Sequence, residues 1–363
     1  MSNFFDMACN TETLLHRSLT PFASPEVQGY EMALCRYFGV EEAIAVASGT
    51  AAIHCALAAL DIGPGDEVLV PSLAVVMSIV PVLYQGATPI FVDSAPGRVD
   101  FDYEDLERKI TPRTKAILPV YLWGCGYTMD QLMQVATMHH LAVIEDACQA
   151  HGSQWQGRYL GTWGKIGCFS TKDGKIMSTW EGGFLLTNDH HLAEKCRALR
   201  THWAKAAHDP THYSQLGYNY RFPEVLAWLG HKQVDALDRL LAHRYAQSMY
   251  LLKGLATELE SYHYAGPERS NLFSPVFLLS EEEGRKGIAA RLAKRGVANS
   301  VGSFGLKPAH LWPIFAHCSP HPIVTPHTQQ FLSRVLAISV LPQYTDEELD
   351  GIIEVITSTL GEG

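Results

Sequence analysis

The stretch VIEDACQAHGSQWQGRYLGTWGKIGCFSTKDGKIMSTWEGG, residues 143–183, decides the fold. Its first residues continue an apolar run, 141–144, which is bounded by polar residues and therefore predicts a buried strand. Glu145 and Asp146 follow directly, so they would stand at the carboxyl end of that strand. This is the edge at which open α/β sheets bind their ligands. Taken alone, a strand-end aspartate is also a common helix cap or ion-pair partner.

The same stretch holds three side chains that together match one cofactor. A second short strand, predicted over residues 167–170, would bring up Ser170, and Lys175 follows five residues later. Pyridoxal phosphate requires a carboxylate aimed at its ring nitrogen, a lysine able to form an imine and a hydroxyl for its phosphate. Asp146, Lys175 and Ser170 could supply these groups. The sequence therefore favours a pyridoxal phosphate site.

Strands and helices alternate along the first half of the chain. Apolar runs predict strands over residues 43–47, 67–70, 90–93, 116–121, 141–144, 167–170 and 184–187. Apolar residues at helical spacing fill the intervals between them, for example over 26–38. This alternation predicts an α/β fold, with a mostly parallel central sheet that is flanked by helices on both faces.

A turn after the first predicted strand is a candidate anion site. Ser48, Gly49 and Thr50 stand between that strand and the helical pattern of residues 51–60. The free N–H groups and the dipole of a helix amino terminus favour a bound anion such as a phosphate. An ordinary turn, with Ser48 or Thr50 as the helix N-cap, fits the same residues equally well.

The C-terminal third predicts a second, smaller unit. A long helical tract covers residues 224–255, and we place the domain boundary within it. Beyond it we expect a strand over 272–279, a helix over 281–295, a strand over 335–340 and a last helix opened by the capping box of Thr345 and Glu348. The predicted division is a large domain with the N-terminal segment, residues 1–238, and a small C-terminal α+β domain, residues 239–363.

Composition limits the possible partners of the chain. Its 363 residues, 47% of them hydrophobic, can form one large domain and a smaller one. A net charge of -10 with mixed signs argues against nucleic acid or an anionic membrane as partner. The eight cysteines include no CxxC pair, so reduced thiols are expected in place of disulfides or a zinc framework.

Neither a targeting segment nor a metal site is expected. The first residues, MSNFFDMACNTETLL, lack the basic and then apolar order of a signal peptide, and the longest apolar stretch, 73–84, is too short to span a bilayer. We therefore expect a cytoplasmic protein with no membrane partner. Among seventeen histidines, His208 and His212 have helical spacing in a loop with a proline, which is more typical of a solvated surface than of metal ligands.

Six motifs in one order carry a family resemblance. They are SGTAAIHCAL (48–57), PGDEVLVPS (64–72), VYLWG (120–124), EDACQAHG (145–152), the stretch from GCFS to EGG (167–183) and GYNYR (217–221). With these gaps, residues 25–240 resemble the DegT/DnrJ/EryC1/StrS family of pyridoxal-phosphate-dependent sugar aminotransferases, and the remainder resembles it loosely. The resemblance implies fold type I, the aspartate aminotransferase-like fold.

The resemblance assigns the catalytic roles. Asp146 would pair with the protonated pyridine nitrogen and keep the ring an electron sink. Lys175 would bind the cofactor as an imine and, once released by the substrate amine, act as the base that moves the proton. Lys165 and Lys172 are the competing lysines. The family's spacing from the serine and to the Glu-Gly-Gly element selects Lys175.

The resemblance also implies how the rest of the cofactor is held. Ser170, Gly49 and Thr50 would bind the phosphate through hydroxyl and backbone donors. Gln149 would lie on the side of the phenolic oxygen, although an ordinary surface amide is the simpler reading of that residue alone. Asn219 resembles the residue that family members insert into the neighbouring subunit's phosphate site. A homodimer with shared active sites is therefore implied.

Several positions depart from the family pattern near the cofactor. Val75 occupies the place of an aromatic residue over the ring, so apolar packing would replace stacking there. Trp180 stands where glycine is usual, and Tyr121 where histidine is common. Tyr121, Glu181 and a further residue of the PAHLWPIF segment, His310, are candidate substrate contacts. Arg221 could be another, but a structural ion pair is favoured.

The resemblance implies an aminotransferase that moves an amino group from L-glutamate or L-glutamine to a keto sugar nucleotide or a keto cyclitol. Its partners would be that small-molecule ketone and the amino-acid donor. Two alternatives stay open. One is a dehydratase or another non-transaminating pyridoxal phosphate enzyme of the same family, against which Lys175 speaks. The other is a non-catalytic regulatory descendant, supported only by Val75 and Trp180.

Overall fold

The computed structural model describes residues 24–204, 211–262, 269–285, 287–319 and 322–362. Within these ranges, seven strands form the central sheet in the order β1-β9-β8-β5-β4-β2-β3. Their bounds are β1 (Glu42–Val46), β2 (Glu67–Pro71), β3 (Thr88–Val92), β4 (Thr114–Ile117), β5 (Ala142–Asp146), β8 (Ile166–Ser170) and β9 (Gly183–Thr187). A separate hairpin pairs β6 (Gln154–Trp155) with β7 (Arg158–Tyr159).

Most pairings in this sheet are parallel. β3, β2, β4, β5 and β8 pair in parallel, whereas β9 pairs antiparallel with both β8 and β1. The turn back into β9 starts and ends at one edge of the sheet, because Ser170 and Gly183 are register partners. The loop that carries Lys175 therefore stands at the carboxyl end of β8, beside the carboxyl end of β5.

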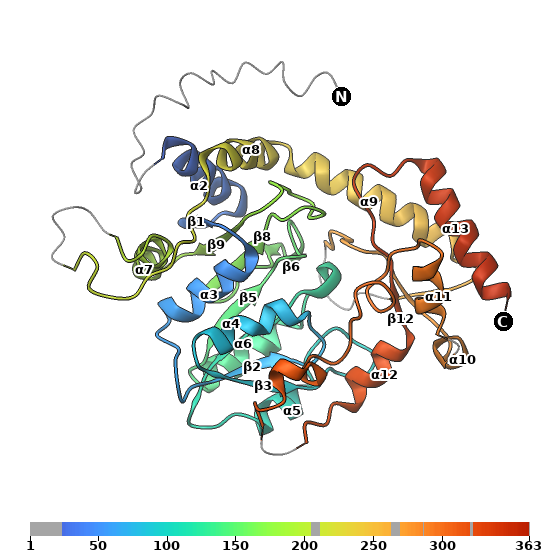
Figure 1. Cartoon of the computed structure of the whole chain (residues 1–363), viewed down its shortest axis with the longest axis horizontal. Helices are drawn as coiled ribbons and strands as arrows, with labels where there is room; N and C mark the ends of the chain where they lie inside the picture. The colour runs from blue at the N-terminus through green and yellow to red at the C-terminus, as the bar shows by residue number, and fades with distance from the viewer. Residues whose placement is uncertain (1–23, 205–210, 263–268, 286, 320–321, 363) are drawn as a thin grey trace.

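Successive residues of each strand point to opposite faces, and helices cover both. On one face, α2 (Pro25–Phe38), α5 (Tyr103–Arg108), α6 (Met129–Met138) and α8 (Glu224–Asp235) pack on side chains such as Val143 and Phe169. On the other, α3 (Gly49–Ala59), α4 (Val76–Tyr84) and α7 (His190–Arg200) pack on neighbours such as Ile144 and Cys168. The predicted mostly parallel sheet between helical layers is confirmed (Figure 1).

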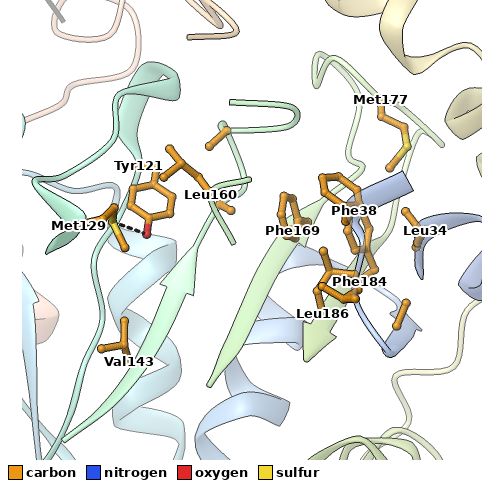
Figure 2. Close-up of a cluster of buried hydrophobic side chains, with 14 of the residues drawn as sticks. Leu34, Phe38, Tyr121, Met129, Val143, Leu160, Phe169, Met177, Phe184 and Leu186 are labelled. Carbon is orange, nitrogen blue, oxygen red and sulfur yellow. Dashed lines mark hydrogen bonds between the residues drawn. The ribbon is translucent and has the colours of Figure 1, made fainter. Parts of the chain in front are cut away.

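An aromatic cluster joins α2 to the strands on either side of the lysine loop. Phe169 of β8 and Phe184 of β9 stack with their ring centroids 4.6 Å apart, and Phe38 of α2 lies 5.3 Å from Phe169 (Figure 2). Each buried phenylalanine contributes about 2 kcal/mol or more by leaving water. The two strand ends that support the lysine loop are therefore held firmly in the core.

A buried ion pair fixes α2 to the edge of the sheet. Glu31 of α2 accepts hydrogen bonds from Arg200 at 2.6 Å and from the N–H of Ala45 in β1 at 2.8 Å. The helix itself begins after the N-cap Ser24 and ends at Gly39, whose left-handed φ of 67° permits the C-terminal turn. The helix predicted over residues 26–38 is confirmed.

The C-terminal part has its own sheet and core. α9 (Leu237–Gly254) leads into it, and an antiparallel sheet forms from β10 (Glu260–Ser261), β11 (Val276–Leu278) and β12 (Val335–Ala337). Its helices are α10 (Glu281–Arg285), α11 (Ile288–Lys294), α12 (Pro326–Arg334) and α13 (Asp346–Gly361), and Figure 1 shows α9, α11 and α13 beside the central sheet. Short 3₁₀ turns are η1 (Leu122–Gly124), η2 (Ala309–Leu311) and η3 (Pro313–Phe315).

Local details of this part differ from the sequence-based expectations. The strand expected over 272–279 is shorter, because Leu272 adopts a left-handed φ of 44°. The helix expected over 281–295 divides at Gly287, whose φ is 66°. The capping box of Thr345 and Glu348 is confirmed. The predicted division between residues 238 and 239 falls inside α9 and stays a prediction. No helix within the described ranges is long and apolar enough to cross a membrane.

Candidate active site

A cavity of about 260 Å³ lies at the carboxyl edge of the central sheet. Loops that follow β1, β2, β4, β5 and β8 all contribute to its wall, as expected for a ligand site in a parallel sheet. The cavity brings together most of the residues that the sequence singled out: Gly49, Thr50, Val75, Tyr121, Asp146, Gln149, Ser170, Lys175 and Glu181.

Asp146 brings a buried carboxylate to this cavity. It is the last residue of β5, and its Oδ1 accepts a hydrogen bond from the N–H of Cys148 at 3.0 Å. The backbone around it is also tied to the neighbouring strand connection, since its carbonyl accepts from the N–H of Tyr121 at 3.0 Å. The carboxylate is therefore held in a fixed orientation, which is what a partner for a cationic ring nitrogen requires.

Lys175 lies in the loop between β8 and β9 and lines the same cavity. Burial lowers the pKa of its amine below the ordinary lysine value, while nearby Asp146 acts in the opposite direction. A lowered pKa leaves more of the amine neutral, and the neutral amine is the nucleophile. No described residue forms a hydrogen bond or an ion pair with Nζ; the ring of Phe273 lies beneath it, with the centroid 5.2 Å away.

The two competing lysines have different positions. Lys165 precedes β8, at the opposite end of that strand from Ser170, and it is exposed. Lys172 also lines the cavity but is exposed, and its Nζ donates to the carbonyl of Asp173 at 3.2 Å. Of the three, Lys175 is the one that lines the cavity without being exposed, because its side chain is half-buried.

The amino terminus of α3 forms a cradle at one end of the cavity. Ser48 is the N-cap, and its Oγ accepts from the N–H of Ala51 at 3.0 Å, so the ordinary capping role is confirmed. A side chain at Gly49 would not fit, because an added Cβ would lie 2.8 Å from both Cys148 Sγ and Ser170 Cβ. The first N–H groups of a helix have no partner within it, so those of this turn can face an anion.

Gln149 is fixed by a backbone contact. Its Oε1 accepts a hydrogen bond from the N–H of Trp123 at 2.6 Å, and Trp123 has a left-handed φ of 57°. With the oxygen engaged, the amide nitrogen of Gln149 is the group available to donate to a molecule in the cavity. This arrangement makes Gln149 more than a surface amide.

Tyr121 lines the cavity without offering its hydroxyl to it. The hydroxyl donates to Glu145 at 2.6 Å and lies 3.3 Å from the sulfur of Met129 (Figure 2). Burial and the adjacent Glu145 raise the pKa of Tyr121 well above its ordinary value. Glu145 in turn accepts from the N–H groups of Gly161 and Gly164 at 2.7 and 2.6 Å. These contacts support a structural role for both side chains.

Two predicted residues lie outside the cavity. His310 is buried beside Phe91, where its Nδ1 lies 2.9 Å from Ser72 Oγ, so this geometry gives no support to a substrate contact. Asn219 is exposed and lines a separate groove of about 1,230 Å³ together with Arg221. Within its own chain, Asn219 therefore cannot complete the cavity that contains Lys175.

The cavity wall includes two residues that sequence reasoning did not assign. Ser78 of α4 is buried, and its Oγ has no hydrogen-bond partner among the described residues. Cys148 packs against Gly49, and burial raises the pKa of its thiol. Both residues could have been suspected from the sequence by their proximity to the family motifs. Ser78 follows the PGDEVLVPS motif, and Cys148 directly precedes Gln149 in the EDACQAHG motif.

Trp180, the most unusual residue of the lysine loop, is 63% exposed and has a left-handed φ of 66°. Its backbone is held from both sides, because its carbonyl accepts from the N–H of Asp173 at 2.8 Å and its N–H donates to Ser178 Oγ at 3.3 Å. The next residue, Glu181, lines the cavity.

Among the described residues, no cluster of His, Cys, Asp or Glu is arranged to hold a metal ion; His208 lies outside them.

The sequence pattern of the DegT/DnrJ/EryC1/StrS aminotransferase family matches residues 9–357. The chain belongs to this family. Aminotransferases of the family use pyridoxal phosphate, and this protein is accordingly a pyridoxal-phosphate-dependent aminotransferase of fold type I.

Individual relatives are similar to this protein over most of the chain. A GDP-perosamine synthase of Caulobacter vibrioides is 44% identical over 218 residues, which are 59% of this chain and 58% of that protein. A UDP-N-acetyl-3-dehydro-alpha-D-glucosamine 3-aminotransferase of Acidithiobacillus ferrooxidans is 36% identical over 89% of this chain and 85% of its own length. The structure of S. venezuelae DesV with a ketimine intermediate superposes with a TM-score of 0.83 at 31% identity, over 93% of this chain and 90% of that one.

The cavity of this aminotransferase fits the cofactor. A buried carboxylate, a half-buried lysine and a helix amino terminus packed without room for a side chain at Gly49 surround one space. These are the three groups that the ring nitrogen, the aldehyde carbon and the phosphate of pyridoxal phosphate need. The unpaired Ser78 hydroxyl adds a further polar group to the wall.

Proposed function

We propose that the protein transfers the amino group of L-glutamate or L-glutamine to a keto group of a sugar nucleotide. One observation carries the proposal: Lys175, Asp146 and the Gly49 turn face a single cavity in a chain of this family. The names of the two relatives above contain GDP and UDP, which supports a nucleotide-linked acceptor. A keto cyclitol remains the alternative acceptor.

Lys175 and Asp146 carry the chemistry in this proposal. Bound pyridoxal phosphate supplies an electron sink that stabilises negative charge at the carbon bearing the amino group. Lys175 Nζ would act as the base that takes the proton from that carbon, a task suited to an amine whose pKa burial has lowered. Asp146 holds the positive charge of the ring nitrogen in place by its own fixed negative charge.

Other residues bind and orient. Ser170 and the N–H groups at Gly49 and Thr50 hold the phosphate, and Gln149 donates its amide nitrogen to the oxygen substituent of the ring. Val75 supplies apolar packing on the ring. Glu181, Tyr121 and His310 remain candidate substrate contacts. Glu181 has the best support because it lines the cavity, whereas the Tyr121 hydroxyl is engaged by Glu145 and His310 lies outside the cavity.

We also propose a homodimer with shared active sites. Asn219 is exposed in its own groove, so it is available to reach a cavity on a second copy. Its backbone is fixed by a bridge to Thr201, which holds it on the surface of the chain. The proposed location is the cytoplasm; the seven cysteines in the described ranges are all free thiols, as a reducing compartment favours.

A spectral half-reaction tests the proposal. The protein is loaded with pyridoxal phosphate, the visible absorbance of the lysine-bound cofactor is recorded, and L-glutamate or L-glutamine is added. We expect the visible band to give way to the near-ultraviolet band of the pyridoxamine form. No visible band in the native protein would contradict an enzyme of this kind. A visible band that no amino acid converts would favour the rival, a non-transaminating pyridoxal phosphate enzyme.

A further inference from the structure

Phe273, a residue of the C-terminal part, lies against the lysine of the active site. Its ring centroid is 5.2 Å from Lys175 Nζ, a separation at which the face of an aromatic ring attracts an ammonium group. Among the residues that the structure describes, none forms a hydrogen bond or ion pair with this Nζ. The face of the Phe273 ring is therefore a direct contact of this amine, in addition to the nearby charge of Asp146.

Helix α9 holds the backbone of Phe273 in place. Arg244 Nη1 donates to the carbonyl of Phe273 at 2.9 Å, and Ser248 Oγ donates to the carbonyl of Leu272 at 2.8 Å. Leu272 adopts its left-handed conformation between these two contacts. Two side chains of one helix thus fix a backbone conformation that a leucine adopts only at a cost, and such conformations persist where the surroundings determine them.

A third contact ties Phe273 to the opposite wall of the site. The N–H of Phe273 donates to Asn271 Oδ1 at 3.0 Å. Asn271 Nδ2 donates in turn to the carbonyls of Gln149 and His151, at 2.9 and 3.0 Å. The segment that carries the ring is therefore fastened directly to the loop after β5, on which Gln149 stands. Any displacement of this segment would disturb both Lys175 and Gln149.

Arg244 is an unusual residue to find in this position. It is 2% exposed, its Cζ lies 5.5 Å from the Phe273 centroid, and its Nε and Nη2 have no hydrogen-bond partner in the described part of the chain. Burial lowers the pKa of its guanidinium to about 10. A buried cation with incomplete pairing does not add to stability in general. What it does provide is the hydrogen bond and the ring contact that orient Phe273.

We propose that Phe273 is a positioning residue for Lys175: the face of its ring holds the amino group whenever the lysine is not bonded to the cofactor, and Arg244 keeps the ring in that place. This inference rests on the proposed function, in which Lys175 is the reacting lysine. The first half of a transamination releases the lysine amine, and the second half needs it back at the same carbon. A ring fixed by α9 returns the amine to one position, so the C-terminal part takes part in the chemistry of the site.

The test measures how readily Lys175 loses its proton. The full chain, free of cofactor, is acetylated with acetic anhydride at a series of pH values, and the rate at Lys175 is followed by mass spectrometry. Phe273→Leu keeps an apolar side chain but removes the ring, so the ammonium loses its partner and the pKa of Lys175 should fall, by about 0.5 to 1 unit. Phe273→Tyr keeps the ring face and should leave the pKa unchanged.

Two further variants separate positioning from general damage. Phe277→Leu is the matched control, because Phe277 is buried in the core of the C-terminal part and should leave the pKa of Lys175 unchanged. Arg244→Lys keeps the positive charge but loses the fork that binds the Phe273 carbonyl, so it should lower the pKa by less than Phe273→Leu does. It also carries the test if Phe273→Leu does not fold.

The outcomes are distinct from those of the proposed function. An unchanged or raised pKa of Lys175 in Phe273→Leu overturns the positioning role, as does an equal fall in Phe277→Leu. Loading with pyridoxal phosphate should protect Lys175 from acetylation in the native chain. If it does not, Lys175 is not the reacting lysine and the proposed function fails at that point, whereas the pKa comparison still reports whether the ring holds the amine.

Discussion

Two hollows of very different size divide the residues that the sequence singled out. The cavity at the carboxyl edge of the sheet, of about 260 Å³, contains Lys175 and Asp146, whereas the groove beside α2, α7 and α8, of about 1,230 Å³, contains Asn219 and Arg221. The smaller one is lined by the half-buried Lys175 and by the buried carboxylate of Asp146. The larger one also contains buried charged groups, but these are ion-paired, as in Glu31 with its partner Arg200.

The difference shows that chemistry, and not volume, marks the site. A buried charge with few partners is costly, so its presence in the small cavity points to a ligand that completes it. Among the described residues that line the groove, none is a buried charged group without a partner, and the groove fits a surface that meets another molecule. Asn219 is the one predicted cofactor contact in the groove, so it connects the two hollows only if a second copy brings them together.

The largest effect should come from removing the amine of the small cavity. Lys175→Ala should lower amino transfer by at least about 10⁴-fold, because both the nucleophile and the proton carrier are lost. Initial rates of transfer from L-glutamate measure it. Lys172→Ala is the matched control on the same loop and should retain activity within about threefold. A Lys175→Ala enzyme as active as the control would show that the cavity was assigned wrongly.

Removing the charge of Asp146 should have the next largest effect. Asp146→Asn keeps the shape and the acceptor oxygen for Cys148 N–H but loses the negative charge that stabilises a cationic ring, so kcat should fall by about 10² to 10³-fold. Asp173→Asn, on the exposed part of the lysine loop, serves as control and should change kcat little. Equal kcat values for Asp146→Asn and Asp173→Asn would contradict a role for the negative charge of Asp146.

The sequence anticipated the small cavity better than the groove, for physical reasons. Asp146, Ser170 and Lys175 come together because carboxyl ends of neighbouring strands share one edge, and the apolar runs that make those strands are local signals. Phe273 reaches Lys175 from about 100 residues away through contacts of α9, which no local pattern encodes. Its segment was expected to be strand, since β-branched and aromatic residues favour strands and the left-handed Leu272 could not be foreseen.

The position of Asn219 illustrates a second limit. The sequence motif predicts what Asn219 binds, but the separation of groove and cavity within one chain depends on how β1, α7 and α8 pack. His310 is a similar case, because its neighbour in space, Ser72, is 238 residues away in sequence. The roles of Asn219 and His310 were both assigned from the family resemblance. That resemblance does not reveal on which side of the sheet each side chain lies.

The link between the two hollows can be tested by mixing variants. Asn219→Ala alone should weaken cofactor affinity by about 10-fold or more, because a polar contact to the phosphate is lost. In a mixed dimer of Asn219→Ala and Lys175→Ala subunits, one of the two sites regains both residues. At a cofactor concentration too low to fill the Asn219→Ala dimer, an equal mixture should therefore recover about a quarter of native activity. Unfolding and refolding the mixture permits subunits to exchange between dimers. The rate of amino transfer then measures the recovered activity. No recovery would mean that the groove does not serve the partner's cavity.

A smaller effect concerns a buried histidine in the loop after β5. His151 is fully buried against Phe169 and Phe184, and burial lowers its pKa to about 3. The unfolded chain binds a proton near pH 6.5, so the free energy of unfolding should fall by about 1.4 kcal/mol per pH unit from this group as the pH drops from 6.5 toward 3. His151→Leu should flatten the slope, measured by denaturant unfolding. His191→Gln, an exposed control, should leave it unchanged.

The smallest effect is expected at Trp180, on the exposed part of the loop that carries Lys175. Trp180 is mostly exposed and has a left-handed φ, so Trp180→Gly should raise the free energy of unfolding by about 0.5 kcal/mol, since relief of backbone strain exceeds the added flexibility of glycine. Thermal unfolding measures it. Lys172→Gly on the same loop relieves no such strain and should lower stability by about the same amount. A loss of stability at both positions would mean that the indole has packing partners.

The central claim, that the small cavity is the cofactor site and that Lys175 is its reacting lysine, has one direct test. The native chain is loaded with pyridoxal phosphate, reduced with borohydride to make the lysine linkage permanent, digested and mapped by mass spectrometry. The account predicts one pyridoxyl group per chain, on Lys175. A pyridoxyl group on Lys172 or Lys165, or none at all, would contradict it.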